Sequence, residues 1–310
     1  MTSITEKPRE SGTPASAASW DKALRALGTL PPFSPILNRL LASLAGEEVS
    51  FAALAGLIEK DTVVAGNVLH LVNSALYARR GTVNSVRHAV SLLGVDKLRN
   101  GILGMSITRM WRTARPADSW PTLRFNLHSA ATAILSDMLA DRLRVAYPEG
   151  AFVAGLMHDV GRLLIAVGLP QEHDIILERC RSQGGAIEDH EVAVLGFAHP
   201  QLSQQALAYW KLPEPIQWAV RDHHAPPAAD PSGELPLARL IAAADQYVNA
   251  VGISILVPGN RAQANLPGGL RQDSGPAVAV LEQLGVSGAP LDTVLGEFRA
   301  EFDAMAPFFR

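Results

Sequence analysis

Residues 151–168 read AFVAGLMHDVGRLLIAVG, an apolar run that contains the adjacent pair His158 and Asp159. An imidazole and a carboxylate are costly to bury unless partners satisfy them. The run therefore predicts a buried helix near the centre of the fold. It also predicts that polar side chains from other parts of the chain meet this pair.

Apolar residues recur with helical spacing on both sides of this run. Ile36, Leu37, Leu40, Leu41 and Leu44, for example, share one helix face. Further helices are expected over residues 51–60, 62–72, 85–94, 96–111, 121–145, 172–182, 187–195, 200–210, 214–224 and 235–251, with one or two more from about residues 278 and 291. Only residues 253–257 resemble a strand, so the sequence predicts an all-α chain.

The distribution of turn-forming residues suggests three parts. Residues 1–19 are rich in Ser, Thr, Pro and Ala and are expected to be disordered. Residues 20–252 form the principal domain, with an N-terminal helical lobe (20–116) and a helical bundle (117–252). Residues 253–310 are expected to hold a loop and a C-terminal helical extension.

Composition excludes several classes of protein. The net charge of −3 argues against general binding of polyanions. The single cysteine, Cys180, excludes an intramolecular disulfide and suits a reducing compartment. The N-terminus lacks the apolar core of a secretory signal, and no uninterrupted apolar run is long enough for a membrane span. A cytoplasmic protein is expected.

Seven side chains have the chemistry to bind metal. Imidazole and carboxylate together suit one or two first-row ions, with iron, manganese and zinc as the candidates. The alternatives are a hydrogen-bonded buried pair at His158, an exposed helix start at His199, and cations at a helix C-terminus for His223 and His224. The candidate ligands are His128, His158, Asp159, His199, His223, His224 and Asp245.

Five motifs in this order resemble the HDOD family, the HD-related output domains of bacterial signalling proteins, within the HD superfamily of metal-dependent phosphohydrolases. The stretch that resembles the family extends from about residue 30 to residue 245. The motifs are LPPFSP (30–35), IEKDTVVAGNVLHLVNSALY (58–77), SVRHAVSLLGVDKLRN (85–100), GLMHDVGRLL (155–164) and GFAHPQLSQQALAYWKLPEPIQWAVRDHH (196–224). The resemblance implies an N-terminal lobe packed on an HD-like bundle, and signalling usually without catalysis.

The candidate ligands also resemble those of cyclic-di-GMP phosphodiesterases of the HD-GYP type. That resemblance implies that Asp159 bridges two metals and that the histidines complete each shell. If the protein is active, Asp159 and Arg162 are the catalytic candidates. Three features depart from the pattern: Arg162 replaces a lysine, no Gly-Tyr-Pro follows His224, and Arg124 replaces a glutamate. A cation such as Arg124 could instead pair with an aspartate and replace metal.

A basic segment offers a second candidate site. Residues 79–115 hold eight Lys or Arg and one acidic residue. Such asymmetry is typical of a patch for an anion or partner, although a solvated helix face is the alternative. The candidate patch is Arg79, Arg80, Arg87, Arg99, Arg109 and Arg112.

The expected function is regulation of bacterial signal transduction through protein–protein contacts, gated by a nucleotide or metal in an HD-like cleft. The first alternative is a metal-dependent phosphodiesterase or phosphohydrolase acting on a nucleotide such as cyclic di-GMP. The second is a nucleic-acid-binding regulator that uses the basic segment, with steep salt dependence.

Overall fold

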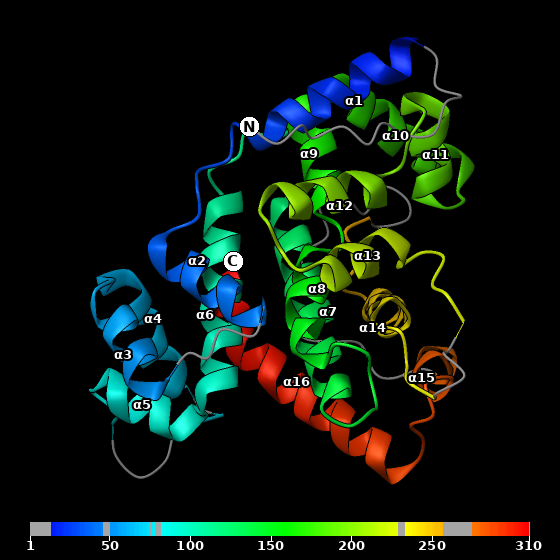
Figure 1. The fold of residues 1–310 in the computed structure, drawn as a ribbon. Helices are drawn as coiled ribbons and strands as arrows, with labels where there is room; N and C mark the ends of the chain where they lie inside the picture. The colour runs from blue at the N-terminus through cyan, green and yellow to red at the C-terminus, as the bar shows by residue number, and fades with distance from the viewer. Residues whose placement is uncertain are drawn as a thin grey trace.

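The computed structural model describes residues 14–45, 50–74, 76–77, 82–228, 233–256 and 275–309. Within these ranges the protein is helical, and only an isolated bridge between Val145 and Leu235 has β geometry (Figure 1). The predicted all-α fold class is confirmed.

The helices follow most of the expected periodic segments. Their bounds are α1 Pro14–Leu27, α2 Pro35–Ala42, α3 Phe51–Glu59, α4 Thr62–Val72, α5 Val86–Leu93, α6 Val95–Trp111, α7 Thr122–Ala140, α8 Ala151–Met157, α9 Val160–Gly168, α10 Pro170–Gln183, α11 Ile187–Leu195, α12 His199–Tyr209, α13 Glu214–Asp222, α14 Leu237–Ala250, α15 Gly275–Glu282 and α16 Ala289–Phe309. Short 3₁₀ turns occupy Ser43–Ala45 and Pro148–Gly150.

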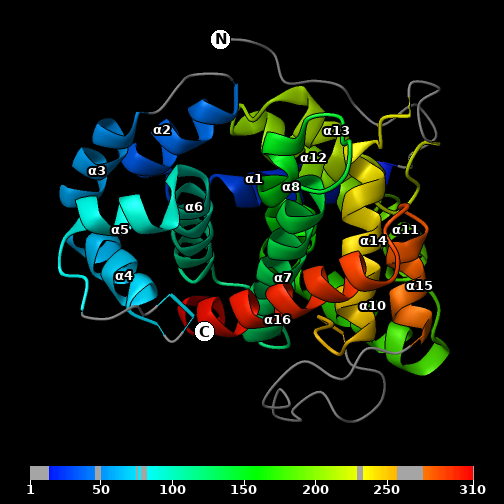
Figure 2. The same cartoon turned by 90° about the horizontal axis from the view of Figure 1, so that it is seen from below.

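Two groups of helices lie side by side. The smaller lobe consists of α2 to α6. Its first four helices, α2 to α5, pack beside α6, and Figure 2 shows them in blue and cyan at one side of the molecule. The larger bundle is built on α7, which contacts α8 and α14, while α12 packs on α9 and α13. This arrangement matches the expected N-terminal lobe against a helical bundle.

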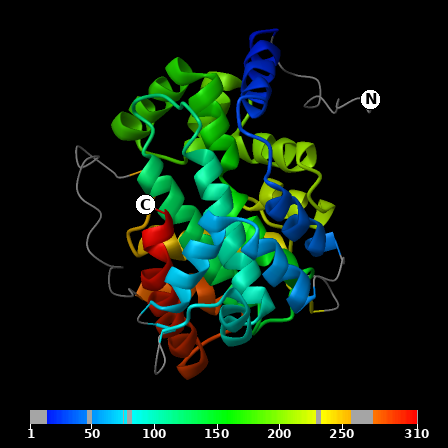
Figure 3. The same cartoon turned by 90° about the vertical axis from the view of Figure 1, so that its left-hand side faces the viewer.

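The N-terminal helix differs from the expectation. Helix α1 begins at Pro14, so residues 14–19 are helical and were wrongly included in the disordered segment. Residues 1–13 lie outside the described part. Helix α1 packs on α9, α11 and α12 of the larger bundle (Figure 3), because Ala23, Ala26 and Leu27 form a buried stripe at helical spacing.

The C-terminal helix is part of the core. Figure 2 shows α16, in red, running across α7 to the smaller lobe, where it contacts α6 and α4. The buried ring of Phe309 and a hydrogen bond from the Asn126 amide to the Phe309 carbonyl, at 3.2 Å, fix its end. A loop was expected within residues 253–310; residues 257–274 lie outside the described part, and α15 begins at Gly275.

The single helix expected over residues 151–168 is two helices. A turn at His158 and Asp159 separates α8 from α9, and the backbone of Asp159 leaves helical geometry at φ −100° and ψ 10°. Residues 148–168 form the one described segment that is long and apolar enough to span a membrane, but 89% of its 18-residue window is buried inside the protein. The segment is therefore a core element of the bundle.

Two glycines beside this turn allow the neighbouring helices to approach closely. A Cβ at Gly155 would lie 2.8 Å from the Cα of Ala133 in α7. A Cβ at Gly161 would lie 2.2 Å from the carbonyl oxygen of His199, at the start of α12. The absence of side chains at these positions lets α7 and α12 bring their histidines to the turn.

Candidate metal centre

The structure brings all seven predicted metal-ligand candidates together. His128 comes from α7, His158 and Asp159 from the turn between α8 and α9, and Asp245 from α14. His199 begins α12, and His223 and His224 follow α13. These seven residues are called the His/Asp cluster below.

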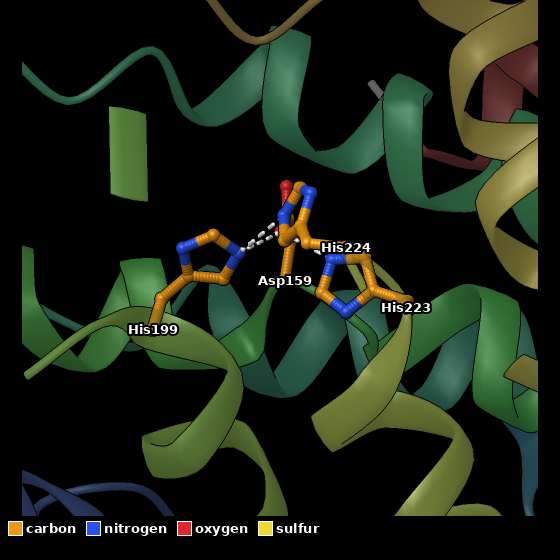
Figure 4. A group of neighbouring side chains, drawn as sticks. All are labelled: Asp159, His199, His223 and His224. Atoms are coloured by element: carbon orange, nitrogen blue, oxygen red, sulfur yellow. Dashed lines mark hydrogen bonds and ion pairs between the residues drawn. The ribbon is translucent and has the colours of Figure 1, made fainter. Parts of the chain in front are cut away.

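Asp159 lies between two sets of histidines. Its Oδ1 is 2.9 Å from Nε2 of His199 and 3.8 Å from Nε2 of His223. Its Oδ2 is 3.6 Å from Nε2 of His158 and 4.0 Å from Nε2 of His128. Figure 4 shows His199, His223 and His224 gathered around this carboxylate. One carboxylate is therefore shared by both halves of the cluster.

The two halves are each compact enough to hold an ion. The potential ligand atoms of Asp159, His199, His223 and His224 lie within 4.8 Å of one another, as do those of His128, His158 and Asp159. Asp245 adds a carboxylate to the second half, with Oδ1 3.0 Å from Nε2 of His128. The Asn249 amide donates to the same oxygen at 2.8 Å and holds the carboxylate in place.

Every histidine of the cluster turns Nδ1 outward to an acceptor and Nε2 inward. Because carbonyl and carboxylate oxygens only accept, each Nδ1 carries a proton and donates it. In a neutral ring the inward Nε2 is then an unprotonated lone pair, which is the form that ligates metal. The acceptors are the Ile253 carbonyl for His128, the Gly155 carbonyl for His158, Glu191 for His199, the Val220 carbonyl for His223 and Glu188 for His224, all between 2.6 and 2.8 Å.

The spacing of the inward nitrogens fits a metal shell. Nε2 of His128 and Nε2 of His158 are 3.3 Å apart, and Nε2 of His199 and Nε2 of His224 are 3.2 Å apart. Two nitrogens bound to one tetrahedral zinc at 2.0–2.1 Å would be about 3.3–3.4 Å apart. Two lone pairs at that distance repel unless a proton or a cation lies between them.

His223 supplies a further indication of a missing partner. Its Nε2 is buried and has no hydrogen-bond partner among the described residues. Burial, followed by the neighbouring His224 and His158, holds the pKa of His223 well below its usual range, so the ring is neutral. A neutral buried imidazole with an unpartnered Nε2 fits a metal ligand.

The carboxylates carry the negative charge that a cation requires. Burial opposes ionisation of Asp159, but His158, Arg162 and His199 hold its pKa well below the usual value. Burial likewise opposes ionisation of Asp245, and hydrogen bonds from His128 and His158 lower its pKa. Burial disfavours charge on His199 too, yet Glu191 and Asp159 raise its pKa to about 10. Without a metal, protons on the neighbouring histidines therefore balance the negative charge of these carboxylates.

Arg162 is the cation that reaches Asp159. Its Nη1 donates to Oδ2 of Asp159 at 3.0 Å, one turn along α9. Arg124, the sequence-based candidate for pairing with an aspartate, donates to the Ser254 carbonyl at 3.2 Å. Arg162 occupies one face of the shared carboxylate and leaves Oδ1 directed at His199.

Two glutamates of the site were missed from the sequence. Glu188 and Glu191 lie on α11 and accept hydrogen bonds from Nδ1 of His224 and Nδ1 of His199. Glu191 also accepts the backbone N–H of His199 at 2.8 Å, and its side chain is 2% exposed. Their separation of three positions, which places them on one helix face, was the available signal.

The cluster is enclosed, with one residue near the surface. His158 and His199 are fully buried, so the alternative of an exposed His199 is wrong. Asp245 is 8% exposed. The side chain of His224 is 35% exposed and forms the rim. His224 is therefore the member of the cluster most accessible to solvent.

Most of the patch arginines that the structure describes already have a hydrogen-bond or ion-pair partner. Arg87 pairs with Glu59 at 3.6 Å, and Arg99 pairs with Asp96 at 3.2 Å. Arg112 donates to the Phe308 carbonyl at 3.4 Å. Arg109 is exposed and has no such partner among the described residues. Arg79 and Arg80 lie outside the described part.

An all-α bundle around a buried His–Asp pair is the architecture of an HD-type domain. Residues 30–226 match the family model of the HDOD domain. The chain belongs to the HDOD family.

Solved structures with the same fold come from several bacteria. An HDOD domain protein of unknown function from Geobacter sulfurreducens is 24% identical, with a TM-score of 0.69 over 93% of this chain and 98% of that one. A candidate signal transduction protein from Marinobacter aquaeolei is 23% identical, with a TM-score of 0.63 over 95% and 66%. A candidate phosphohydrolase from Shewanella amazonensis is 20% identical, with a TM-score of 0.66 over 93% and 98%. At these identities the likeness is one of fold.

A curated relative is longer than this chain. An uncharacterized protein from Treponema pallidum (strain Nichols) is 22% identical over 227 residues, which are 71% of this chain and 42% of that protein. The match thus spans less than half the length of that relative.

Proposed function

We propose that this protein is a cytoplasmic signal-transduction regulator that binds two divalent metal ions in its His/Asp cluster and acts through contacts with partner proteins. The family and a structural neighbour described as a candidate signal transduction protein support the signalling role. The metal-bound bundle is the proposed active form, because binding at the cluster ties α7, α12, α13 and α14 to the central turn.

One observation carries the metal assignment. Two pairs of inward Nε2 atoms face each other at 3.2 and 3.3 Å while every Nδ1 is committed to an acceptor. His199, His223 and His224 would hold one ion and His128, His158 and Asp245 the other, with Asp159 shared. Iron, manganese and zinc all accept this mixture of imidazole and carboxylate.

The burial of the cluster supports regulation over turnover. The cluster is buried except at His224, which disfavours a bulky substrate, and Arg162 is committed to Asp159 rather than directed outward. A metal pair in such a place stabilises one arrangement of helices, which is a sufficient basis for a regulator. The proposed partners are signalling proteins, with a cyclic dinucleotide or other nucleotide as a ligand at the rim.

Phosphohydrolase activity is the second candidate function. The shared carboxylate of Asp159 and the intact histidine set favour it, and one neighbour of the same fold is described as a candidate phosphohydrolase. A bound metal pair would supply an activated water and charge stabilisation for phosphodiester hydrolysis. Here Asp159 would hold the metals, and Arg162 would orient Asp159 or contact a phosphate.

The two functions separate in a single set of measurements. Metal content is determined for the wild type and for Asp159→Asn, and each protein is assayed with bis(p-nitrophenyl) phosphate and with cyclic di-GMP. A regulator shows metal that depends on Asp159 and no hydrolysis above the Asp159→Asn background. Hydrolysis that requires Asp159 would establish the enzyme instead. Absence of metal after anaerobic reconstitution would overturn both.

A further inference from the structure

A second cavity lies in the smaller lobe, away from the His/Asp cluster. Its volume is about 310 Å³, at the small end of the range for ligand pockets. Three segments line it: the connection from α1 to α2, the first turns of α4, and one face of α6. None of its lining residues belongs to the cluster, so it is a site distinct from the proposed metal centre.

The walls of the cavity are largely apolar. Phe33 and the prolines beside it form one side, Val63 and Val64 of α4 form another, and Met105 and Met110 of α6 form the third. Val63 is 45% exposed, so it lies at the mouth of the cavity. These surfaces suit the flat apolar body of a small organic molecule.

Three polar groups in the cavity are not committed to the protein. Ser106 and Arg109 lie one turn apart on α6, and Asn67 faces the cavity from α4. Their side chains have no hydrogen-bond or ion-pair partner among the described residues. Arg109 is thus the uncommitted cation of the cavity, and a guanidinium binds carboxylate or phosphate in a paired geometry.

The other polar groups are already engaged. Oδ1 of Asp61 accepts the backbone N–H groups of Val63 and Val64, both at 3.1 Å, and caps α4, while its Oδ2 has no partner among the described residues. The hydroxyl of Thr113 donates to the Met110 carbonyl at 2.7 Å. On α6, Arg109 and Ser106 therefore offer free donors to an anion, and the carboxylate of Asp61 requires that the anionic group of a ligand lie at the α6 side of the cavity.

We propose that this cavity is a binding site for a small organic anion with a single-ring apolar body. The anionic group pairs with Arg109 and accepts from Ser106 or Asn67, and the ring lies between Phe33, Val63 and Met105. The basic segment thus provides a defined site for one anion, in place of an extended patch for a polyanion.

The test uses the full chain and two probes of the same shape. Benzoate and its neutral isostere benzamide are titrated in ligand-observed NMR against the wild type, Arg109→Gln, and Ser106→Leu, which fills the cavity. The matched control is Arg87→Gln, which removes the same charge from an exposed arginine of α5. Thermal unfolding of each variant verifies that it is folded.

Benzoate is expected to bind saturably and more tightly than benzamide. Arg109→Gln should weaken benzoate binding by roughly tenfold, as expected for loss of a charge-assisted contact, and should leave benzamide unchanged. Ser106→Leu should abolish binding of both probes, and Arg87→Gln should affect neither. Absence of saturable benzoate binding, or binding that Arg109→Gln leaves unchanged, overturns the proposal.

Discussion

Glu191 fixes His199 from two directions. Its Oε2 accepts the Nδ1 proton of the ring at 2.7 Å and the backbone N–H of the same residue at 2.8 Å. Nε2 of His199 is thereby directed at Oδ1 of Asp159, 2.9 Å away. A carboxylate behind a histidine orients the ring and increases its basicity, which strengthens a metal ligand.

Replacement of this carboxylate should weaken metal binding. Glu191→Gln retains the shape of the side chain but not its charge, and we expect the affinity for zinc or manganese to fall by about 10–100-fold. Isothermal titration of metal-free protein measures this change. Asp189→Asn, an exposed position on the same helix, is the control and should bind as the wild type does. Equal affinities for Glu191→Gln and the control would contradict the role assigned to Glu191.

Metal should raise the stability of the folded protein. Metal-free protein treated with a chelator should unfold at a lower temperature than protein with metal restored. At a free metal concentration of 100 times Kd, the gain in the free energy of unfolding is about 2.7 kcal/mol. Asp159→Asn should show little gain. A melting temperature indifferent to metal in the wild type would count against binding to the folded cluster.

Helices α9 and α12 pack so closely at Gly161 that a side chain at this position should destabilise the protein. Gly161→Ala places a Cβ 2.2 Å from the His199 carbonyl oxygen, so the helices must separate. We expect a loss of about 3 kcal/mol in the free energy of unfolding, at the upper end for overpacking, together with weaker metal binding. Chemical denaturation measures the loss.

The matched glycine control is Gly66 in α4. A Cβ there meets nothing within 4 Å, and alanine is the better helix former. Gly66→Ala should therefore raise the free energy of unfolding by up to about 1 kcal/mol. Similar effects of the two substitutions on the free energy of unfolding would show that the close contact between Gly161 and His199 does not cause the loss of stability.

Asp137 should make stability depend on pH. Burial, with a contribution from Asp141 and a smaller one from Glu301, raises its pKa to about 6, although Asn100 and Arg99 oppose the shift. The folded protein thus holds this proton more tightly than the unfolded chain, and stability falls as pH rises from about 4 through 6. Asp137→Asn should stabilise the protein by about 3 kcal/mol at pH 7.5 and by only about 1 kcal/mol near pH 4.5. Urea denaturation at both pH values tests this, and an equal effect at the two would refute it.

The sequence predicted the elements better than their junctions. Apolar spacing located α5 at Val86–Leu93 within one residue of each expected end, because Val86, Ala89, Val90 and Leu93 form one buried face with that period. The break at Asp159 was not predictable from the apolar run, since it depends on partners from α9 and α12. The helix at Pro14–Leu27 was partly missed because its Ser and Ala residues resemble a disordered segment until the packing on α9 is known.

The members of the His/Asp cluster were predictable from the sequence, but the residues that hold the histidines in place were not. Imidazole and carboxylate in apolar surroundings indicated His128, His158 and Asp245 directly. Glu191 lies among other polar residues in IEDHEV, and only the packing of α11 beside α12 distinguishes it from exposed Asp189. Likewise, the partner of Lys97 is Glu301, 3.2 Å away and distant in sequence, which no local pattern reveals.

The central claim is that the His/Asp cluster binds two metal ions that share Asp159. The most direct test is the metal content of anaerobically purified protein by mass spectrometry, for the wild type beside Asp159→Asn. The account predicts close to two equivalents of iron, manganese or zinc in the wild type and a large loss in the variant. A folded wild type that stays empty after anaerobic reconstitution, or a variant that keeps its full metal content, would contradict it.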